Sequence, residues 1–221
     1  MNLSNDTIAI FKNFANINQN ILVKPGKKLN TISTMKNILA TADVKEDFEQ
    51  EFAIYDLPEF LRTLDLFETP TLKFNGGSSV GISGKDGRSS SKYTFADKSV
   101  IVAPTKAISM PDSDITFKFS KENLNRLMKG VVTLNLPDIE VIGDGSKIKL
   151  VANDRKNKAS NKFDIDIGTT DKTFKAYFKA ENFKMIEDDY DVAISKQKIS
   201  HFVNRNKPVQ YWIALEPESE F

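Results

Sequence analysis

Cysteine is absent from this sequence of 221 residues, and histidine occurs once, at position 201. The absence of cysteine excludes disulfides and thiolate metal sites, and it is compatible with a reducing compartment. One histidine without cysteine cannot build a familiar zinc site. We therefore expect no metal centre, and we assign His201 a structural role in a strand or turn.

Long apolar runs are also missing from the sequence. No stretch reaches the roughly 18 apolar residues that a helix needs to cross a bilayer. The N-terminus, MNLSNDTIAIFKNF, is polar where a secretory signal would be basic and then continuously apolar. A cytoplasmic location is the default expectation.

Motifs for catalysis are likewise absent. The glycines at 76, 77, 84 and 87 are not followed by a Gly-Lys-Ser or Gly-Lys-Thr helix start, so no phosphate loop is predicted. Serine is plentiful, but no histidine arrangement could activate it. The acidic run at 187–191 lacks the ligand spacing of a calcium loop and is interpreted as a solvated turn. We expect no enzyme activity, no catalytic residues and no cofactor.

The composition is that of a folded, nearly neutral protein. Hydrophobic residues make up 40% and charged residues 28%, and the formal net charge is +1. This balance gives no overall signal for nucleic acid or membrane, so an electrostatic function would require local segregation of charge. The length suits one large domain or two ordinary ones.

Four segments have the periodicity of short amphipathic helices. Ser4 is a predicted N-cap ahead of residues 5–17, and Asp56 with Glu59 forms a capping-box pattern. Ser120 precedes a third helix, which Gly130 is placed to end. Residues 180–187 form a fourth and weaker candidate.

Alternating strand patterns separate these helices, with turn sequences at 75–77, 85–87 and 143–145. The predicted strands are 52–57, 115–119, 147–152, 162–168, 173–180, 189–195 and 209–216. Sheet should therefore dominate an α+β protein.

The helix entries at Ser4, Asp56, Ser120 and Ala180 are separated by 52, 64 and 60 residues. This spacing predicts a unit of strand, short helix and antiparallel strands that is repeated four times, two units to a domain. Prolines at 104 and 111 favour an extended connector over about 97–114, between domains at 1–105 and 106–221. A single irregular α+β domain with coincidental spacing stays open as an alternative.

Four segments then resemble a known family in order and spacing: LSNDTIAIFKNFANIN at the start, AIYDL before the second helix, VAPTKAI in the connector and ALEPESEF at the end. They are similar to the DNA polymerase sliding clamp, or processivity factor, of T-even-type bacteriophages. The similarity runs from Leu3 to Phe221. Departures concentrate at 75–93 and 153–161, which we expect at hairpin tips, where variation is tolerated.

The resemblance implies a DNA-clamp fold in which short inner helices and outer antiparallel sheets close head to tail into a homotrimeric ring around duplex DNA. Geometry offers a check on the number of subunits. With four helices per subunit lining the hole, two subunits leave a bore of roughly 14 Å and three leave roughly 26 Å. Duplex DNA is about 20 Å across, so three subunits fit.

A clamp should hold DNA by topology and touch phosphates weakly, without reading bases. The helix-borne cations available for this DNA-facing role are Lys12, Arg62, Lys121, Arg126, Lys129 and Lys184. The third helix carries the strongest excess of positive charge. The other helices do not show a basic lining in the sequence alone.

Partner binding is the second role that the resemblance implies. Apolar anchors in a shallow groove suit exchangeable peptides, here the C-terminal peptide of the polymerase. Candidates for this partner-peptide pocket are Val100, Ile101, Val102, Ile108, Leu215 and Pro217. A clamp-loader ATPase and late-transcription factors are further implied partners, in the cytoplasm of an infected bacterial host, with no membrane involved.

The alternative function is a nucleic-acid-binding or structural phage protein without ring topology. It would expose aromatic side chains as stacking platforms, yet most phenylalanines lie at apolar-face positions. The acidic C-terminus, EPESEF, also leaves two interpretations open: a frayed tail, or a segment that takes part in docking the loader or polymerase.

Overall fold

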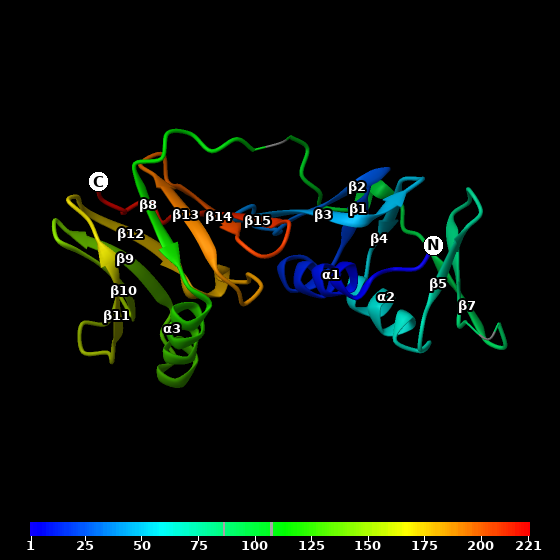
Figure 1. Cartoon of the computed structure of the whole chain (residues 1–221), viewed down its shortest axis with the longest axis horizontal. Helices are drawn as coiled ribbons and strands as arrows, with labels where there is room; N and C mark the ends of the chain where they lie inside the picture. The colour runs from blue at the N-terminus through cyan, green and yellow to red at the C-terminus, as the bar shows by residue number, and fades with distance from the viewer. Residues whose placement is uncertain (86, 107) are drawn as a thin grey trace. The chain divides into compact units, whose positions relative to one another are not determined.

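The computed structural model describes residues 1–85, 87–106 and 108–221. The chain divides into two compact units, Met1–Ala107 and Ile108–Phe221. Both units combine short helices with antiparallel sheets, so the α+β class predicted from the sequence is confirmed (Figure 1). Within the described ranges, no helix has the length and hydropathy that crossing a bilayer would require.

The first unit runs from an N-terminal helix into short strands. Its elements are α1 (Asn5–Ile17), β1 (Ile21–Val23), β2 (Gly26–Ile32), β3 (Ile38–Phe48), β4 (Phe52–Ile54), α2 (Leu57–Leu64), β5 (Thr71–Phe74), β6 (Ser79–Ser83), β7 (Ser90–Thr94) and the 3-10 turn η1 (Lys98–Val100). The strands pair antiparallel, β1 with β4, β2 with β3, and β6 with β5 and β7.

Both helices of the first unit begin at the predicted caps. Ser4 Oγ accepts a hydrogen bond from the Thr7 N–H at 3.3 Å, and Asp56 Oδ1 accepts one from the Glu59 N–H at 2.8 Å. Each cap satisfies an N–H group that the helix cannot pair, and contributes about 1 kcal/mol. The Phe11 ring then joins α1 to the neighbouring helix and strand through edge-on contacts with other phenylalanines.

The second unit carries one longer helix and two sheets. Its elements are β8 (Ile115–Phe119), α3 (Lys121–Leu134), β9 (Asp138–Asp144), β10 (Lys147–Asn153), β11 (Phe163–Thr169), β12 (Thr173–Lys179), the 3-10 turn η2 (Ala180–Asn182), β13 (Tyr190–Ser195), β14 (Ile199–Asn204) and β15 (Val209–Ala214). The strand orders are β11-β10-β9-β12 and β15-β14-β13-β8, all antiparallel. Phenylalanine and tyrosine rings from both sheets meet between them and form the core of this unit.

The predicted end of the third helix at Gly130 is wrong. The helix continues to Leu134, and Asn135 ends it in the left-handed conformation with φ of 53°. Gly130 is needed for a different reason: a Cβ atom there would lie 2.6 Å from the Phe163 ring at the start of β11. The glycine therefore allows α3 to approach the sheet closely.

The predicted fourth helix at 180–187 is also wrong. Only η2 forms there, and the chain then runs irregularly to β13. The Asp188 carboxylate fixes this segment by accepting hydrogen bonds from Lys207 Nζ at 2.8 Å and from Asn206 Nδ2 at 2.5 Å. Because the fourth position holds a 3-10 turn, the calculation of the bore from four helices per subunit does not apply to this chain.

The strand predictions are confirmed in outline, and their errors lie mostly in the first unit. Residues 115–119 match β8, and 209–216 contain β15. The sequence analysis did not predict β1, β2, β3, β5, β9 and β14, and it extended β4 into the cap of α2. It also treated 75–93 as hairpin tips, whereas much of that segment forms β6 and β7.

Replacing Gly130 by alanine should destabilise the second unit. Alanine normally stabilises a helix by about 0.5 to 1 kcal/mol relative to glycine. Here the added Cβ must displace the Phe163 ring, so we expect a net loss of about 1 to 3 kcal/mol. Urea unfolding followed by the fluorescence of Trp212, the only tryptophan, measures this loss. Val132→Ala, at a position 76% exposed, is the matched control and should change stability by less than about 0.5 kcal/mol. A gain in stability for Gly130→Ala would contradict the packing argument.

The buried Asp188 should make stability depend on acidity. Burial alone would raise the pKa of Asp188, but the hydrogen bonds from Lys207, Asn206 and the Asp189 N–H outweigh it and hold the pKa well below its usual range. A carboxyl group with a lowered folded-state pKa stabilises the fold above its unfolded pKa, and this contribution is lost as the pH falls.

We therefore expect the free energy of unfolding to decrease from about pH 5 downwards. Asp188→Asn should cost about 1.5 to 3 kcal/mol at neutral pH and flatten this decrease, because it removes the titrating group. Lys207→Met should reduce the pH dependence as well. Urea unfolding at a series of pH values measures both effects, and equal slopes for the wild type and Asp188→Asn would contradict the assignment.

Candidate functional site

The helices of the first unit present polar faces with balanced charge. In α1 the exposed stripe contains Asn5, Ala9, Lys12 and Asn16, while Phe14 on the opposite side is fully buried. The exposed charges of α1 and α2 together are Asp6, Lys12, Glu59 and Arg62, with Asp65 at the C-cap of α2.

An ion pair connects these two helices. Lys12 Nζ lies 3.6 Å from Asp65 Oδ1, and both side chains are more than half exposed. Exposed pairs of this kind contribute little to stability, because water and salt screen them. The Asp65 carboxylate lowers the positive potential around Lys12. The other predicted cation on the helices of the first unit, Arg62, has no ion pair among the described residues.

The exposed face of α3 is more basic. Lys121, Glu122, Arg126 and Lys129 lie on it, with a net charge of +2, while Leu124 and Leu127 face the core. Arg126 Nη1 lies 3.9 Å from Glu122 Oε1, a weak pair one turn apart. Lys121 and Lys129 have no ion pair within the described part of the chain. The amphipathic pattern predicted for this helix is confirmed.

Lys184 is exposed, but it does not belong to a helix. It follows η2 in the irregular segment that Asp188 fixes, and its backbone N–H donates to Asn182 O at 2.9 Å. The sequence predicted that Lys184 lies on a helix, and this prediction is wrong. Its DNA-facing role stays a prediction.

The residues proposed for partner binding fall in both units. In the first unit, Val100 is 53% exposed in η1, and Val102 is tied to the body by hydrogen bonds from Asn18 Nδ2 to Val102 O (3.1 Å) and from Val102 N–H to Asn20 Oδ1 (3.0 Å). Ile101 is half-buried beside it. The connector therefore starts from a fixed point on the first unit.

In the second unit, Ile108 is 38% exposed and Pro217 is exposed, whereas Leu215 is only 5% exposed. The Leu215 side chain thus belongs to the core. The structure does not relate the positions of the two units, so whether all six residues form one pocket stays a prediction.

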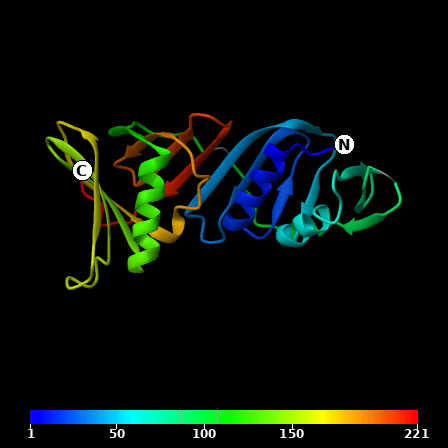
Figure 2. The same ribbon diagram turned by 60° about the horizontal axis from the view of Figure 1, so that its bottom comes forward.

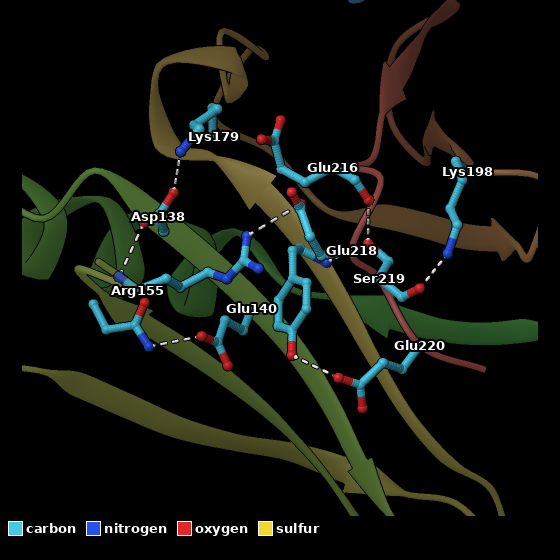
Figure 3. Close-up of polar contacts among 11 residues, drawn as sticks. Asp138, Glu140, Arg155, Lys179, Lys198, Glu216, Glu218, Ser219 and Glu220 are labelled. Carbon is cyan, nitrogen blue, oxygen red and sulfur yellow. Dashed lines mark hydrogen bonds and ion pairs between the residues drawn. The ribbon is translucent and has the colours of Figure 1, made fainter. Parts of the chain in front are cut away.

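The C-terminal residues lie along the edge of β12. The Lys175 N–H donates to Glu220 O at 2.9 Å and the Glu220 N–H donates to Lys175 O at 2.8 Å. Ser219 Oγ accepts from the Tyr177 N–H at 3.0 Å and donates to Glu216 O at 2.8 Å. Figure 3 shows this tail beside the charged residues of β9 and β12. The frayed-tail interpretation is wrong, and the docking interpretation stays a prediction.

No arrangement for catalysis is found around the histidine. His201 lies in β14, stacks on Trp212 with ring centroids 4.4 Å apart, and has its Nε2 2.8 Å from Gln210 Oε1. Burial lowers the pKa of His201, and the hydrogen bond with Gln210 opposes this only in part. In the described residues no cluster of three or more His, Asp or Glu side chains is placed to hold a metal ion.

A basic loop escaped the sequence analysis. The β10–β11 connection carries exposed lysines at positions 156, 158 and 162, but its departure from the family pattern led us to treat it only as a variable tip. The signal that could have identified it is the run RKNKASNK, in which no acidic residue separates four cations.

Both halves of the sequence match known families. Residues 4–103 match the family described as DNA polymerase processivity factor, and residues 116–217 match the family described as gp45 sliding clamp, C terminal. Together the two matches cover most of the chain.

Individual relatives agree with these matches. The chain is 32% identical to the sliding clamp of Vibrio phage KVP40, over 98% of this chain and 99% of the relative. It is 28% identical to the sliding clamp of Enterobacteria phage T4, over 99% and 98%, and 34% identical to that of Escherichia phage RB69, over 67% and 64%.

Solved structures share the fold at low sequence identity. A PCNA2–PCNA3 complex from Sulfolobus tokodaii is 15% identical with a TM-score of 0.65, over 99% of this chain and 100% of that one. The proliferating cellular nuclear antigen of Entamoeba histolytica is 13% identical with a TM-score of 0.68, over 96% and 95%. The predicted clamp architecture is therefore confirmed at the level of the fold.

Proposed function

The chain belongs to the sliding clamp family of DNA polymerase processivity factors, and from this premise we propose that it encircles duplex DNA as a homotrimer and tethers the polymerase. The observation that carries the proposal is the match to a sliding clamp over nearly the full length of both chains. Holding a polymerase on its template requires topology and weak contacts, with no bond chemistry. The protein accordingly acts as a non-enzymatic accessory factor without a cofactor.

Two clamp domains, 1–105 and 106–221, make up the proposed subunit. The division of the chain into compact units near residue 107 supports this boundary. A helix follows directly on a strand and precedes further antiparallel strands in each unit, as α2 follows β4 and α3 follows β8. The repeated arrangement gives each subunit two similar bodies from which a ring can be assembled.

Open sheet edges supply a route to ring closure. In the first unit the N-terminus covers β5, because the Leu72 N–H donates to Met1 O at 2.7 Å and Asn2 bridges to Thr71. In the second unit the C-terminal tail covers β12 through Glu220. The outer edges of β7 and β11 have no strand partner among the described residues. The strands β2 and β8 also lie at the end of a sheet. An uncovered edge readily pairs with another chain, so open edges in both units suit head-to-tail joining.

We propose the same DNA-facing residues that the sequence predicted. Their charges are either screened by a neighbouring carboxylate, as for Lys12 and Arg126, or exposed on a mainly polar face, as for Lys121 and Lys129. Such contacts offset phosphate repulsion without encoding sequence, and they exchange through water and counterions. Arg62 and Lys184 complete the proposed set.

For partners, we propose the connector residues Val100, Ile101, Val102 and Ile108, with Pro217, as the surface that takes a polymerase peptide. Their partial exposure supports this role, and Leu215 would support the surface from the core. A clamp-loader ATPase and late-transcription factors are further proposed partners. Because its relatives come from bacteriophages, we propose the cytoplasm of an infected bacterium as the place of action.

The alternative, a phage nucleic-acid-binding or structural protein without ring topology, receives less support. Base stacking needs exposed aromatic rings. Among the large hydrophobic side chains described as exposed, the aromatic ones are Tyr55 and Phe221, and phenylalanines such as Phe14 and Phe60 are buried. A stacking platform is therefore not favoured.

The oligomeric state tests the proposal directly. Size-exclusion chromatography with light scattering should give three times the subunit mass of 24.9 kDa, with dissociation on dilution. After loading, the protein should stay on circular DNA and slide off the same DNA once it is linearised, because topology holds it. A monomer at high concentration, or equal retention on both DNAs, would contradict a ring.

Charge reversal on α3 tests the DNA-facing assignment. Lys121→Glu, Arg126→Glu and Lys129→Glu together should reduce loading onto DNA by at least about tenfold, because lost phosphate contacts weaken binding strongly. The trimer mass should not change. The matched control reverses Lys27, Lys73 and Lys118, three exposed lysines on strands, and should load normally. Normal loading of the α3 variant would show that this face does not meet DNA.

A further inference from the structure

The loop between β10 and β11 carries a concentration of positive charge that the helices lack. Lys156, Lys158 and Lys162 are all exposed, and none has an ion pair within the described part of the chain. Asp154 and Asp164 are the nearest acidic residues in sequence, and Asp154 is engaged with the backbone of the loop. Lys12 and Arg126 each lie within 4 Å of a carboxylate oxygen, whereas among the described residues these lysines have no such pair.

Local hydrogen bonds give this loop a defined shape. Asp154 Oδ1 accepts from the Lys156 N–H at 3.0 Å, the Asn157 N–H donates to Asp154 O at 3.1 Å, and the Ser160 N–H donates to Asn157 O at 3.0 Å. The Asp154 N–H in turn donates to Ser160 Oγ at 3.3 Å. Successive turns therefore hold the backbone while the lysine side chains extend into solvent.

Arg155 has a separate role as the anchor of the loop. Its guanidinium carbon lies 3.7 Å above the Tyr177 ring centroid, and its Nη1 lies 3.9 Å from Glu218 Oε2. Its backbone N–H donates to the buried Asp138 at 3.1 Å (Figure 3). Arg155 thus holds one end of the loop to β9, β12 and the C-terminal tail, and it is not available as a free cation.

The other end of the loop meets α3. Lys162 directly precedes Phe163, whose ring packs against Gly130, and Gly130 is adjacent to Lys129 on the helix. Figures 1 and 2 both show the loop and the C-terminal end of α3 at the same end of the second unit. The loop therefore leads into a strand that packs against α3, next to Lys129 in the sequence of the helix.

We propose that the 154–162 loop is a second DNA-contacting element, in which Lys156, Lys158 and Lys162 bind backbone phosphates of the duplex where it passes the end of α3. The proposal rests on the proposed clamp function, because it needs the α3 face to line the hole. It assigns DNA contact to a hairpin tip that the helix-based set does not include.

The chemistry of the loop favours phosphate over a protein partner. A protein interface relies on apolar or aromatic anchors, and residues 154–162 contain no apolar side chain larger than that of Ala159. Flexible lysines act as point charges that attract phosphate without fixing its geometry. They would strengthen contact with any DNA sequence and still permit sliding.

Salt dependence gives the first test. Binding of the purified clamp to a short fluorescent duplex is measured by anisotropy over a series of salt concentrations. Each lost phosphate contact should reduce the magnitude of the negative slope of log K against log salt by about 0.9, so Lys156→Ser, Lys158→Ser and Lys162→Ser together should reduce that magnitude by about 1 to 3. The matched control, Lys27→Ser with Lys73→Ser and Lys118→Ser, should keep the wild-type slope. Trimer mass and unfolding should be unchanged in both.

The outcomes separate the two proposals. A wild-type trimer that binds duplex with the same slope as the loop variant overturns the loop assignment and leaves the clamp function intact. A wild type that neither trimerises nor is retained on circular DNA overturns both.

Photocrosslinking gives a second and independent test. Because the chain has no cysteine, Lys158→Cys introduces a single thiol that can carry a photoreactive group. On a ring loaded onto nicked circular DNA, this label should crosslink to DNA several-fold more efficiently than the same label at Lys118→Cys. Crosslinking to the loader in place of DNA would identify the loop as a protein contact and overturn the proposal.

Discussion

Burial of one face of each short helix against a sheet is the constraint on which the rest of this structure depends. Phe14 of α1 and Leu127 of α3 are completely buried, and the opposite faces of these helices are left to polar and charged residues. Burying side chains of this size stabilises the fold by about 2 to 3 kcal/mol each, far more than any exposed ion pair. The polar faces can therefore carry the proposed DNA contacts without determining the fold.

This division explains how weak contact and a stable fold coexist. The exposed charges of α1 and α2 are balanced, and Lys12 is screened by Asp65 at 3.6 Å. Phosphate contacts of this kind are independent of sequence, so they can exchange as a protein moves along DNA. Retention by the proposed ring would remove the need for tight binding, so partial charge neutralisation is compatible with the proposed function.

Sequence patterns predicted the elements whose causes are local. The caps at Ser4, Asp56 and Ser120 depend on residues three positions away, and all of them form as expected. The incorrect predictions fall where a contact between residues distant in sequence determines the local structure. In sequence, Gly130 resembles a helix terminus, but in the structure it lies inside α3 and packs against Phe163. Residues 180–187 have a helical pattern, but they form only η2 and an irregular segment next to the contacts of Asp188. The lysines of the 154–162 loop were visible in the sequence, but their place beside α3 was not.

The close approach of α3 to β11 also connects the fold to its surface charge. Because Gly130 has no side chain, Phe163 can seat against the helix, and the loop that precedes Phe163 is brought to the C-terminal end of α3. One glycine thus allows the packing of the helix and the position of the loop, and a bulkier residue would disturb both.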